Sequence, residues 1–467
     1  MSKLIPEEIL NIYRKIQRAG LEVYLVGGCV RNMLLKKPVK DWDMTTNATP
    51  EDLLKIFPQA FYDNKFGTVG IPIQTEGQKE VLEITTFRKE VGFSDKRRPD
   101  KVIWGKSIEE DLARRDFTIN AIALKVTGDT QHETRSSNLS RVTCHVSLID
   151  PYNGQQDIKD KLICAVGNPK ERFKEDALRL LRAVRIATEF LFKIEENTWK
   201  EIVSDAFLIK EVSGERIRTE LLRIIASEHV YEGVMLLKQA NLLNHILPEL
   251  VEGIGVSQKR PGRHHIDDVF THNILSLKFC PSKDPVIRFA ALLHDVGKPK
   301  VKSYDEKGLV IFYNHEVAGA KIAREICDRL KFSRKERDKI VNLIRWHMFS
   351  VDEKLSDAGI RRFIRRIGVE NVKDMMDLRI GDRLGGGTQT AESWRLKLFK
   401  KRIENQLKPL PFSINDLVID GNDIMKELNI KPGPKVGEIL QKLFLEVDED
   451  LSKNNKDYLL KRIKETN

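Results

Sequence analysis

The sequence predicts an α+β chain, in which a small head with a mixed or antiparallel sheet precedes an elongated remainder built of helices. Two observations support this fold class. Between about residues 20 and 150, apolar runs of strand length alternate with short helical stretches, as in VYLVGG at 23–28 and KEVLEITTF at 79–87. After about residue 165, apolar residues recur every three or four positions, which is the spacing of one helix face. We therefore expect the main strands to be gathered in the head.

Composition narrows the class of protein further. The 467 residues carry 80 Lys and Arg against 69 Asp and Glu, a net charge of +11, which favours a polyanionic partner such as nucleic acid or nucleotides. No stretch approaches the ~18 uninterrupted apolar residues of a membrane helix, and MSKLIPEEIL lacks the profile of a signal peptide. The five cysteines are far apart, which disfavours a disulfide framework or a thiolate zinc site. These features predict a cytoplasmic protein without a membrane segment.

Changes of composition at three seams divide the chain into four expected parts. The seams are the turn at 166–169, the stretch VEGIGVSQKRPGRHH at 251–265 and the glycines at 385–387. We expect a head at 1–166, a helical neck at 167–250, a helical body at 251–387 and a helical tail at 388–467. Within the head, the polar segment 125–147 is expected to be a long hairpin connection.

A glycine pair followed by two aspartates marks the candidate site of the head. LVGGCVRNMLL predicts a strand that enters a helix through Gly27 and Gly28, where backbone amides can approach phosphate closely. If Asp41 and Asp43 lie on a strand, their carboxylates face the same way. Adjacent carboxylates repel each other unless a cation lies between them, and Mg²⁺ suits oxygen ligands together with phosphate. Alone, each motif could be an ordinary turn; in succession, they predict a metal-dependent nucleotide site.

A glycine turn followed by two aspartates resembles the pattern of the polymerase-β-like nucleotidyltransferase superfamily, which often has a third acid on a neighbouring strand. Glu83, in VLEIT, has the form of that third position, although it could equally be an outward-facing sheet residue. Two further blocks, EEDLARRDFTINAIAL at 109–124 and NPKERFKEDALRLLRAVR at 168–185, resemble class II tRNA nucleotidyltransferases and bacterial poly(A) polymerases. The resemblance covers the first ~225 residues densely.

The resemblance implies an enzyme that adds or repairs the 3′-terminal CCA of tRNA, transferring CMP and AMP from CTP and ATP without a nucleic-acid template. It implies a catalytic head, a neck that recognises the nucleotide base and a tail that binds tRNA, with no obligate protein partner. Asp41 and Asp43 would be the catalytic residues and would hold two Mg²⁺ ions. The implied nucleotide-binding residues are Gly27, Gly28, Arg31, Arg114, Arg115, Asp116, Asn120, Asp176, Arg179, Arg182 and Arg185.

Asp176 and Arg179 are the residues expected to select the base. Three positions apart on a helix, they would be neighbours on its surface. Cytosine and adenine each present an amine donor beside a ring-nitrogen acceptor, which a carboxylate and a guanidinium would match. Guanine and uracil reverse this order and would be rejected. Without the resemblance, the same residues would be read as an ordinary ion pair on a solvated helix.

The segment RKEVGFSDKRRPDKVIWGKSIEEDLA at 88–113 resembles the flexible loop of CCA-adding and A-adding members, which CC-adding members lack. It departs from many relatives by having Arg98 rather than His before Pro99. A-only addition and poly(A) synthesis stay open as alternatives within this enzyme class.

The second half contains an ordered set of histidines and aspartates, of which the most specific part is HDVGKP at 294–299. The set resembles an HD-type metal phosphohydrolase domain. In that domain the metal ligands would be His272, His294, Asp295 and Asp382, with His315 and His347 as further ligands or phosphate contacts. Imidazole and carboxylate ligands suit a divalent transition metal or Mg²⁺, with bound water as the nucleophile. An alternative function of another class is therefore phosphohydrolysis or cyclic phosphodiester cleavage at RNA ends. Singly, each histidine would be read as a hydrogen-bonded core residue.

Basic helical runs such as RRFIRRIG at 361–368 and GERIRTELLR at 214–223 are typical of solvated charge. If they contact tRNA, they would do so through phosphates and overall shape. The stretch 416–447 resembles the tail module of longer bacterial members.

Overall fold

A computed structural model describes residues 4–39, 41–62, 67–75, 78–91, 101–127, 145–258, 268–407 and 413–465. The chain divides into two compact units, Met1–Pro248 and Glu249–Asn467. Arg98 and Pro99, and most of the expected hairpin connection at 125–147, lie outside the described residues. The division into four parts stays a prediction.

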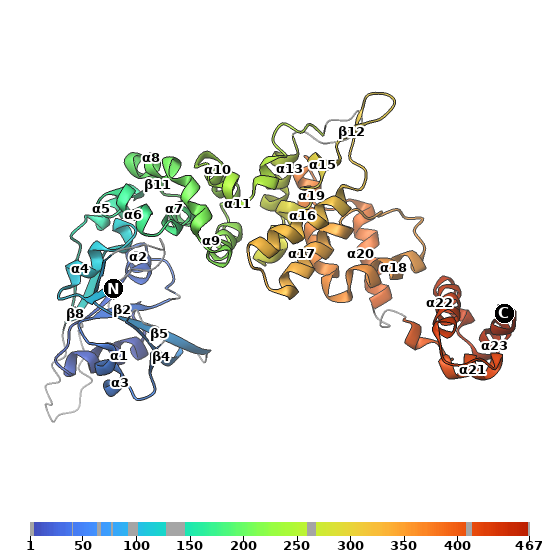
Figure 1. Cartoon of the computed structure of the whole chain (residues 1–467), viewed down its shortest axis with the longest axis horizontal. Coiled ribbons are helices and arrows are strands. Elements are labelled where there is room, and N and C mark those ends of the chain that lie inside the picture. Colours follow the sequence, from blue (N-terminus) through green and yellow to red (C-terminus); the bar gives the residue numbers. More distant parts are fainter. Residues whose placement is uncertain are drawn as a thin grey trace. The chain divides into compact units, whose positions relative to one another are not determined.

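The head, drawn in blue and cyan in Figure 1, is built on one seven-stranded sheet with the order β3-β4-β5-β2-β1-β8-β9. Only β2 and β5 pair in parallel, and the other neighbours are antiparallel, so the predicted mixed sheet is confirmed. The strands are β1 (Val23–Val26), β2 (Asp43–Thr46), β3 (Phe61–Tyr62), β4 (Thr68–Thr75), β5 (Gln78–Thr86), β8 (Ala123–Thr127) and β9 (His145–Ile149). A separate antiparallel pair joins β6 (Arg88–Val91) to β7 (Lys101–Trp104).

Short helices cover the sheet and fix its central strands. In α1 (Glu7–Arg18), the buried Tyr13 donates its hydroxyl hydrogen to the carbonyl of Val23 and accepts a hydrogen bond from the amide of Val126. One side chain thereby connects α1 to β1 and β8. The other helices of the head are α2 (Gly28–Leu34), α3 (Pro50–Ile56), α4 (Ile108–Ala113) and α5 (Gly154–Asp160).

The rest of the first unit is helical apart from the two-residue strands β10 (Leu162–Ile163) and β11 (Lys193–Ile194). Its helices are α6 (Pro169–Glu175), α7 (Leu178–Phe190), α8 (Glu196–Ser204), α9 (Gly214–Ala226), α10 (Val230–Gln239) and α11 (Leu243–Ile246), with α12 (Pro248–Val251) beginning at the border of the second unit. Most residues of α7 are buried, and α9 and α10 pack against it. The arginines of α7 are therefore held in a fixed frame.

The second unit is also helical, apart from the short hairpin of β12 (Ser303–Tyr304) and β13 (Val310–Ile311). Its larger part contains α13 (Val269–Phe279), α14 (Pro285–Leu293), α15 (Lys298–Val301), α16 (His315–Arg329), α17 (Arg334–Trp346), α18 (Asp357–Ile367), α19 (Val372–Gly385) and α20 (Trp394–Leu407). Helices α13 and α19 cross closely because Gly381 has no side chain: a Cβ there would lie 2.4 Å from the carbonyl oxygen of Ser276. This crossing brings His272 of α13 near Asp382 of α19.

The C-terminal helices α21 (Gly421–Leu428), α22 (Pro434–Glu449) and α23 (Lys456–Glu465) share a core that includes Ile424, Val447 and Leu459. A buried ion network joins α22 to α18. The carboxylate of Asp448 accepts hydrogen bonds from Arg361 at 2.9 Å and from Arg365 at 2.6 Å. The expectation that the run RRFIRRIG is solvated charge is therefore wrong for these two arginines, because a partner 83 or more residues away binds them.

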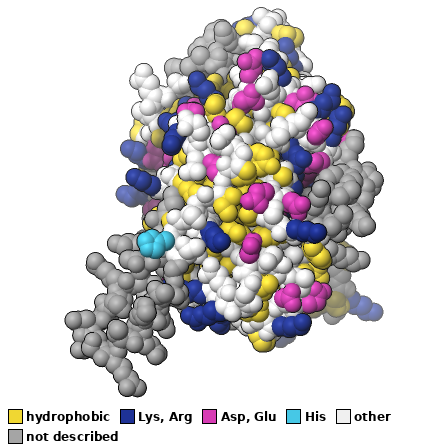
Figure 2. All heavy atoms as spheres, turned by 90° about the vertical axis from the view of Figure 1, so that its left-hand side faces the viewer, with side chains coloured by type: hydrophobic (Ala, Val, Ile, Leu, Met, Phe, Trp, Pro, Cys, Tyr) yellow, Lys and Arg dark blue, Asp and Glu magenta, His cyan; other side chains and the backbone are white. Residues whose placement is uncertain are grey.

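The fold class predicted from the sequence is confirmed: a small mixed sheet precedes the helical remainder. Within the described part of the chain, no helix is both long and apolar enough to cross a membrane. On the face of the molecule shown in Figure 2, Lys and Arg side chains are interspersed with Asp and Glu, so the basic surplus is not gathered there in one patch.

Candidate functional site

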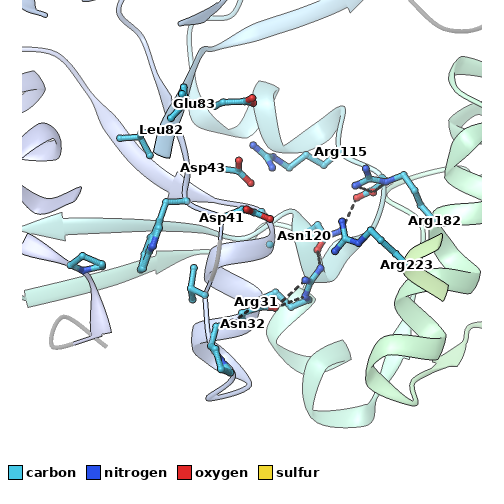
Figure 3. Close-up of a pocket in the computed structure, with 18 of the residues that line it drawn as sticks. Arg31, Asn32, Asp41, Asp43, Leu82, Glu83, Arg115, Asn120, Arg182 and Arg223 are labelled. Carbon is cyan, nitrogen blue, oxygen red and sulfur yellow. Dashed lines mark hydrogen bonds and ion pairs between the residues drawn. The ribbon is translucent and has the colours of Figure 1, made fainter. Parts of the chain in front are cut away.

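A cavity of about 1170 Å³ lies in the first unit, where the turn at Gly27 and the strands β2 and β5 face α7 and α9 (Figure 3). Ten of the thirteen residues predicted to bind the nucleotide or its metal ions line it: Gly27, Gly28, Arg31, Asp41, Asp43, Arg115, Asp116, Asn120, Arg182 and Arg185. The lining also includes Glu83 and Arg223.

The glycine turn at the cavity wall requires glycine. Gly27 has φ 73° and ψ −135°, a conformation that residues with a side chain rarely adopt. A Cβ at Gly27 would also lie 3.0 Å from Nη1 of Arg115 and 3.4 Å from Oδ2 of Asp43. The turn therefore allows a guanidinium and a carboxylate to approach the backbone at the start of α2.

Three carboxylates face the cavity from the sheet side (Figure 3). Asp43 is the first residue of β2 and is in register with Glu83 of the parallel strand β5. Asp41 precedes the strand, so the expectation that both aspartates lie on one strand is wrong; both nevertheless reach the cavity. Burial raises the pKa of Asp43, Glu83 and Asp41 raise it further, and Arg115 opposes them. Clustered carboxylates of this kind, with Asp43 half-buried between the more exposed Asp41 and Glu83, suit a divalent cation.

A hydrogen-bonded chain of side chains forms the opposite wall. Arg31 donates to Oδ1 of Asn120 at 2.6 Å, and the amide nitrogen of Asn120 donates to Asp116 at 3.0 Å. Arg182 donates to the other carboxylate oxygen of Asp116 at 2.8 Å. Burial opposes ionisation of Asp116, but Arg182 and Asn120 outweigh it and lower its pKa. Burial, and then Arg185, lower the pKa of Arg31 to about 10, so Arg31 is still a cation at neutral pH.

Arg114 and Arg115 share the fully buried carboxylate of Asp111. Arg114 binds Oδ1 through Nε at 3.0 Å and Nη2 at 2.6 Å, whereas Arg115 binds Oδ2 at 3.1 Å. Arg115 lines the cavity, but Arg114 is not among the described lining residues. Asp111 thus positions Arg115 beside Asp43.

A second ion network lies between α7 and α9. Arg185 pairs with Glu220 at 2.5 Å and with Glu189 at 3.1 Å, and Glu189 also pairs with Arg223 at 3.2 Å. The side chain of Arg185 is 4% exposed, whereas that of Arg223 is 50% exposed and reaches the cavity. Sequence reasoning did not single out Arg223. The available signal was its place in the basic helical run GERIRTELLR at 214–223.

Asp176 and Arg179 are not neighbours on one helix, which corrects the sequence-based expectation. Helix α6 ends at Glu175, Asp176 has φ −148° and ψ 103°, and α7 begins at Leu178. The cause is local: Oδ1 of Asp176 accepts a hydrogen bond from the amide of Leu178 at 3.1 Å, a contact by which aspartate commonly interrupts helices. Neither residue is among the described lining of the cavity.

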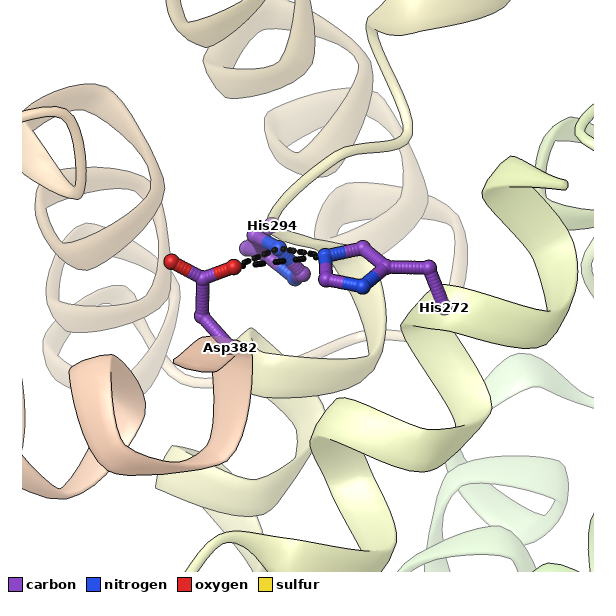
Figure 4. Close-up of side chains that lie close together, drawn as sticks. All are labelled: His272, His294 and Asp382. Atoms are coloured by element: carbon purple, nitrogen blue, oxygen red, sulfur yellow. Dashed lines mark hydrogen bonds and ion pairs between the residues drawn. The ribbon is translucent and has the colours of Figure 1, made fainter. Parts of the chain in front are cut away.

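A second candidate site lies in the other unit, where two groups of side chains could each hold a metal ion: His272, His294 and Asp382, and Asp295, His315 and His347. In the first group, the Nε2 atoms of His272 and His294 are 3.1 Å apart and face Oδ1 of Asp382 at 3.3 and 3.6 Å (Figure 4). In the second, the Nε2 atoms of His315 and His347 are 3.3 Å apart.

Asp295 connects the two groups. Its Oδ2 lies 3.3 Å from Nε2 of both His272 and His294. Its Oδ1 lies 3.2 Å from Nε2 of His315 and 3.6 Å from Nε2 of His347. The buried Lys298 pairs with Asp295 and also donates to Oε1 of Gln258, a contact that sequence reasoning missed. The four predicted ligands and the two further histidines therefore lie together.

The hydrogen bonds of two rings show that these residues fit a metal. Nδ1 of His315 lies 2.8 Å from the carbonyl of Phe312, and Nδ1 of His347 lies 2.7 Å from the carbonyl of Ile344. Because a carbonyl only accepts, each Nδ1 carries a hydrogen, and in a neutral ring the facing Nε2 atom then presents a lone pair to the other ring and to Asp295. Such converging acceptors repel unless a cation lies between them, and this backbone contact is typical of metal-binding histidines.

The protonation of the first group depends on its carboxylates. Burial lowers the pKa of His294, but Asp295 and Asp382 outweigh it and raise the value to about 10. Burial also opposes ionisation of Asp295, but Lys298 and His294 outweigh it and hold the pKa well below its usual range.

Comparison with known proteins agrees with both sites. Residues 23–164 match the family model of the "Poly A polymerase head domain", and residues 273–398 match that of the HD domain. Residues 191–253 match a model described as "Probable RNA and SrmB- binding site of polymerase A". The sheet, the cavity and the histidine cluster thus define a nucleotidyltransferase head joined to an HD domain.

Relatives of full length identify the family. The chain is 31% identical over 469 residues to the CCA-adding enzyme of Pediococcus pentosaceus, covering 98% of this chain and 97% of that one. It is 30% identical over 464 residues to that of Lactococcus lactis subsp. lactis, covering 98% of each. Identity to the Geobacillus kaustophilus enzyme is 39%, but over 241 residues, which are 51% of this chain and 54% of that one. The chain belongs to the family of CCA-adding enzymes.

Solved structures share the fold. The CCA-adding enzyme of Bacillus stearothermophilus in complex with CTP is 24% identical with a TM-score of 0.67, covering 98% of this chain and 97% of that one. That of Thermotoga maritima, complexed with tRNA, is 20% identical with a TM-score of 0.57, covering 100% and 98%.

Proposed function

We propose that this chain completes or repairs the 3′-terminal CCA of tRNA, transferring CMP and AMP from CTP and ATP without a nucleic-acid template. One observation carries this function: in a chain of this family, Asp41, Asp43 and Glu83 converge on one cavity opposite a wall of arginines. The partners are accordingly tRNA, CTP and ATP. The cytoplasmic location stays a prediction.

In the reaction, the 3′-hydroxyl oxygen of tRNA bonds to the α-phosphorus of the nucleotide. The bond from that phosphorus to the bridging oxygen breaks, pyrophosphate leaves with the electron pair, and the hydroxyl proton is released to water. Asp41 and Asp43, with Glu83 beside Asp43, would hold two Mg²⁺ ions, which supply charge that activates the hydroxyl and neutralises the triphosphate. Arg31 and the backbone at Gly28 would contact phosphates, and Arg115 and Asn120 would orient the nucleotide.

Base selection is proposed for Asp176 and Arg179, at the break between α6 and α7. Arg179 is held by the carbonyls of Arg172 at 3.0 Å and Arg114 at 2.9 Å and by Glu175 at 2.6 Å. Its contact with Arg114 places Arg179 next to Arg115, which lines the cavity, and so connects base recognition to the cavity. Arg182 and Arg185, held by Asp116 and Glu220, would give positive charge to the cavity wall.

Three tRNA substrates test the function: one ending before the CCA, one after the first C and one after CC, each with labelled CTP or ATP. CCA addition extends all three to completion. ATP use on the CC-ended substrate alone would indicate an A-adding enzyme, and long ladders would indicate a poly(A) polymerase. A protein that incorporates neither nucleotide would refute the nucleotidyltransferase function.

The convergence of lone pairs at Asp295, His315 and His347 favours a second activity, metal-dependent phosphohydrolysis at RNA ends. A divalent transition metal or Mg²⁺ at this HD site would activate a water molecule. Asp295 would contribute its Oδ2 on the side of His294 and its Oδ1 on the side of His315. Metal content per chain and cleavage of a 2′,3′-cyclic phosphate test this function. A purified protein that neither retains added metal nor cleaves the phosphodiester would exclude it.

A further inference from the structure

An aromatic ring lies on the same face of the sheet as the carboxylates of the head site. Residues directly opposite each other on neighbouring strands share a face. Asp43 of β2 is opposite Glu83 of β5. Gly70 of β4 is opposite Glu83 on one side and Phe61 of β3 on the other. These residues therefore form one row across the sheet, with the carboxylates at one end and the ring of Phe61 at the other.

The ring of Phe61 lies over Gly70 and points towards β5. A Cβ at Gly70 would lie 2.6 Å from Cζ of Phe61, the tip of the ring, and 3.0 Å from Cγ1 of Val81 on β5. The ring and the Val81 side chain therefore approach the same point above β4. Phe61 is 45% exposed and Val81 is 52% exposed, whereas Val69 and Ile71, which alternate with Gly70 along β4, are fully buried. The two side chains thus form an apolar surface, the Phe61–Val81 surface, on the face opposite the core.

The nucleotide cavity reaches this surface. Val81 and Glu83 are two residues apart on one strand, so they share a face, and both line the cavity. Neighbouring strands lie about 4.8 Å apart, so the tip of the Phe61 ring above β4 is roughly one strand spacing from the line of β5 that carries Glu83. A nucleobase stacked on the ring would have its own ribose within reach of the carboxylates.

The direction of attack identifies what this surface would receive. In phosphoryl transfer, the attacking and the leaving oxygen are roughly in line, on opposite sides of the phosphorus. Arg115 and Arg182, whose charge suits the triphosphate, lie on one side of Asp43, and β5 lies on the other (Figure 3). With pyrophosphate leaving on the side of the arginines, the 3′-hydroxyl of the RNA approaches from the side of β5. The Phe61–Val81 surface begins on that side.

We propose that the Phe61–Val81 surface is a stacking platform for the base of the 3′-terminal nucleotide of the RNA acceptor. This inference rests on the proposed function and deepens it, because it assigns a place to the RNA end. Stacking on an aromatic ring tolerates every base, since each base has a π-face. An enzyme that extends ends before the CCA, after C and after CC does not meet the same terminal nucleotide in every round. A platform that stacks the base without reading its hydrogen bonds serves all of these ends.

The test combines variants of the full-length protein with two RNA ends. The acceptors are tRNA ending in CC and the same tRNA with an abasic ribose at its 3′ terminus, which keeps the attacking hydroxyl. The variants are F61A, F61W and G70A. Y62A is the matched control, because it removes an aromatic ring of similar exposure, 44%, from the same strand but from the other face. For each pair, kcat/KM for tRNA and KM for ATP are measured, and thermal unfolding shows whether each variant is folded.

We expect F61A to lower kcat/KM for tRNA ending in CC about tenfold, the size of a typical stacking contribution of one base, at an unchanged KM for ATP. F61W keeps a ring and the original values. G70A resembles F61A, because the added Cβ displaces the tip of the ring. The abasic end lowers kcat/KM about tenfold in the unmodified chain but not further in F61A, since the same contact is already lost. Y62A keeps the original values.

Several results would overturn this platform. They are an unchanged kcat/KM in folded F61A, losses from F61A and the abasic end that add in full, and an equal loss in Y62A. If F61A does not fold, G70A provides the same comparison with the ring still present. Each of these results would leave the proposed function intact, because the unmodified chain still extends tRNA. Absence of any incorporation by the unmodified chain would refute the proposed function itself.

Discussion

At the scale of single residues, the carboxylates of the head site repel one another electrostatically. Asp43 is half-buried beside Glu83 and Asp41, and Arg115 compensates only in part, since the pKa of Asp43 remains raised. Such an arrangement costs stability in the absence of a cation and becomes favourable when a cation binds. The site is therefore prepared for metal and triphosphate rather than for maximal stability.

The substitution D43N is expected to lower nucleotide incorporation strongly while stabilising the metal-free chain. Losing a metal-holding carboxylate removes several kcal/mol of charge stabilisation, which lowers incorporation about a thousand-fold. Because the folded pKa lies above the unfolded value of 3.8, the penalty is fully present above the folded pKa and disappears as the pH falls through it. D43N should therefore raise the free energy of unfolding by about 0.5–2 kcal/mol at neutral pH, and by less in acid.

Thermal unfolding in EDTA at pH 7.5 and pH 5, and again with Mg²⁺, checks this expectation. The gain in the free energy of unfolding should shrink when Mg²⁺ is present, because the cation stabilises the ionised carboxylate of the original chain. A gain that grows towards acid would contradict the assigned cause.

Selection between bases provides a second prediction at the residue scale. D176A is expected to loosen discrimination against UTP and GTP by about 10–100-fold, since a hydrogen bond to a charged group contributes about 1.5–3 kcal/mol. Total incorporation of CTP should fall less than the discrimination ratio, because the catalytic carboxylates are untouched. Competition between labelled CTP and UTP on one tRNA measures both quantities. A variant that slows all four nucleotides equally would argue for a purely structural role of Asp176.

At the scale of elements, local motifs were predictable and distant pairings were not. The strand, the turn at Gly27 and the helix α2 are adjacent in sequence, so their pattern is visible directly. The register of Glu83 against Asp43 joins strands 40 residues apart, which left its sequence-based interpretation open. The helix breaks at Asp176 because the side chain of that residue binds the amide of Leu178. The three- and four-residue spacing of apolar residues gives no sign of such a contact. Likewise, the charge run containing Arg361 did not reveal its partner, Asp448.

The crossing of α13 and α19 leads to a prediction about elements. G381A places a Cβ 2.4 Å from a backbone carbonyl, so the helices must separate, and overpacking of this kind typically costs about 1–3 kcal/mol. Because Asp382 follows directly, retention of metal at the HD site should also fall. The matched control is G437A in α22, where a Cβ would meet nothing within 4 Å. This control should stabilise by about 0.5–1 kcal/mol through helix propensity. Chemical denaturation of both variants measures the difference, and equal stabilities would contradict the close crossing.

At the scale of the whole molecule, the two candidate sites belong to different units. All the described residues that line the nucleotide cavity precede the boundary at Pro248, and all six members of the histidine cluster follow it. The order of motifs in the sequence was sufficient to predict this separation. The paired geometry of the histidines was not predictable, because it depends on three backbone carbonyls that orient the rings.

This separation predicts that the two activities can be removed independently. H347Q should lower the metal content of the chain, because it takes one nitrogen donor from the group around Asp295. The same variant should extend tRNA at the original rate, since His347 lies outside the unit that contains the cavity. Conversely, D41N should abolish extension and leave the metal of the HD site in place. Elemental analysis after gel filtration and single-turnover extension of tRNA measure the two properties on the same samples. Slower extension by a well-folded H347Q would show that the HD site communicates with the head, so that its metal would have a role in nucleotide transfer.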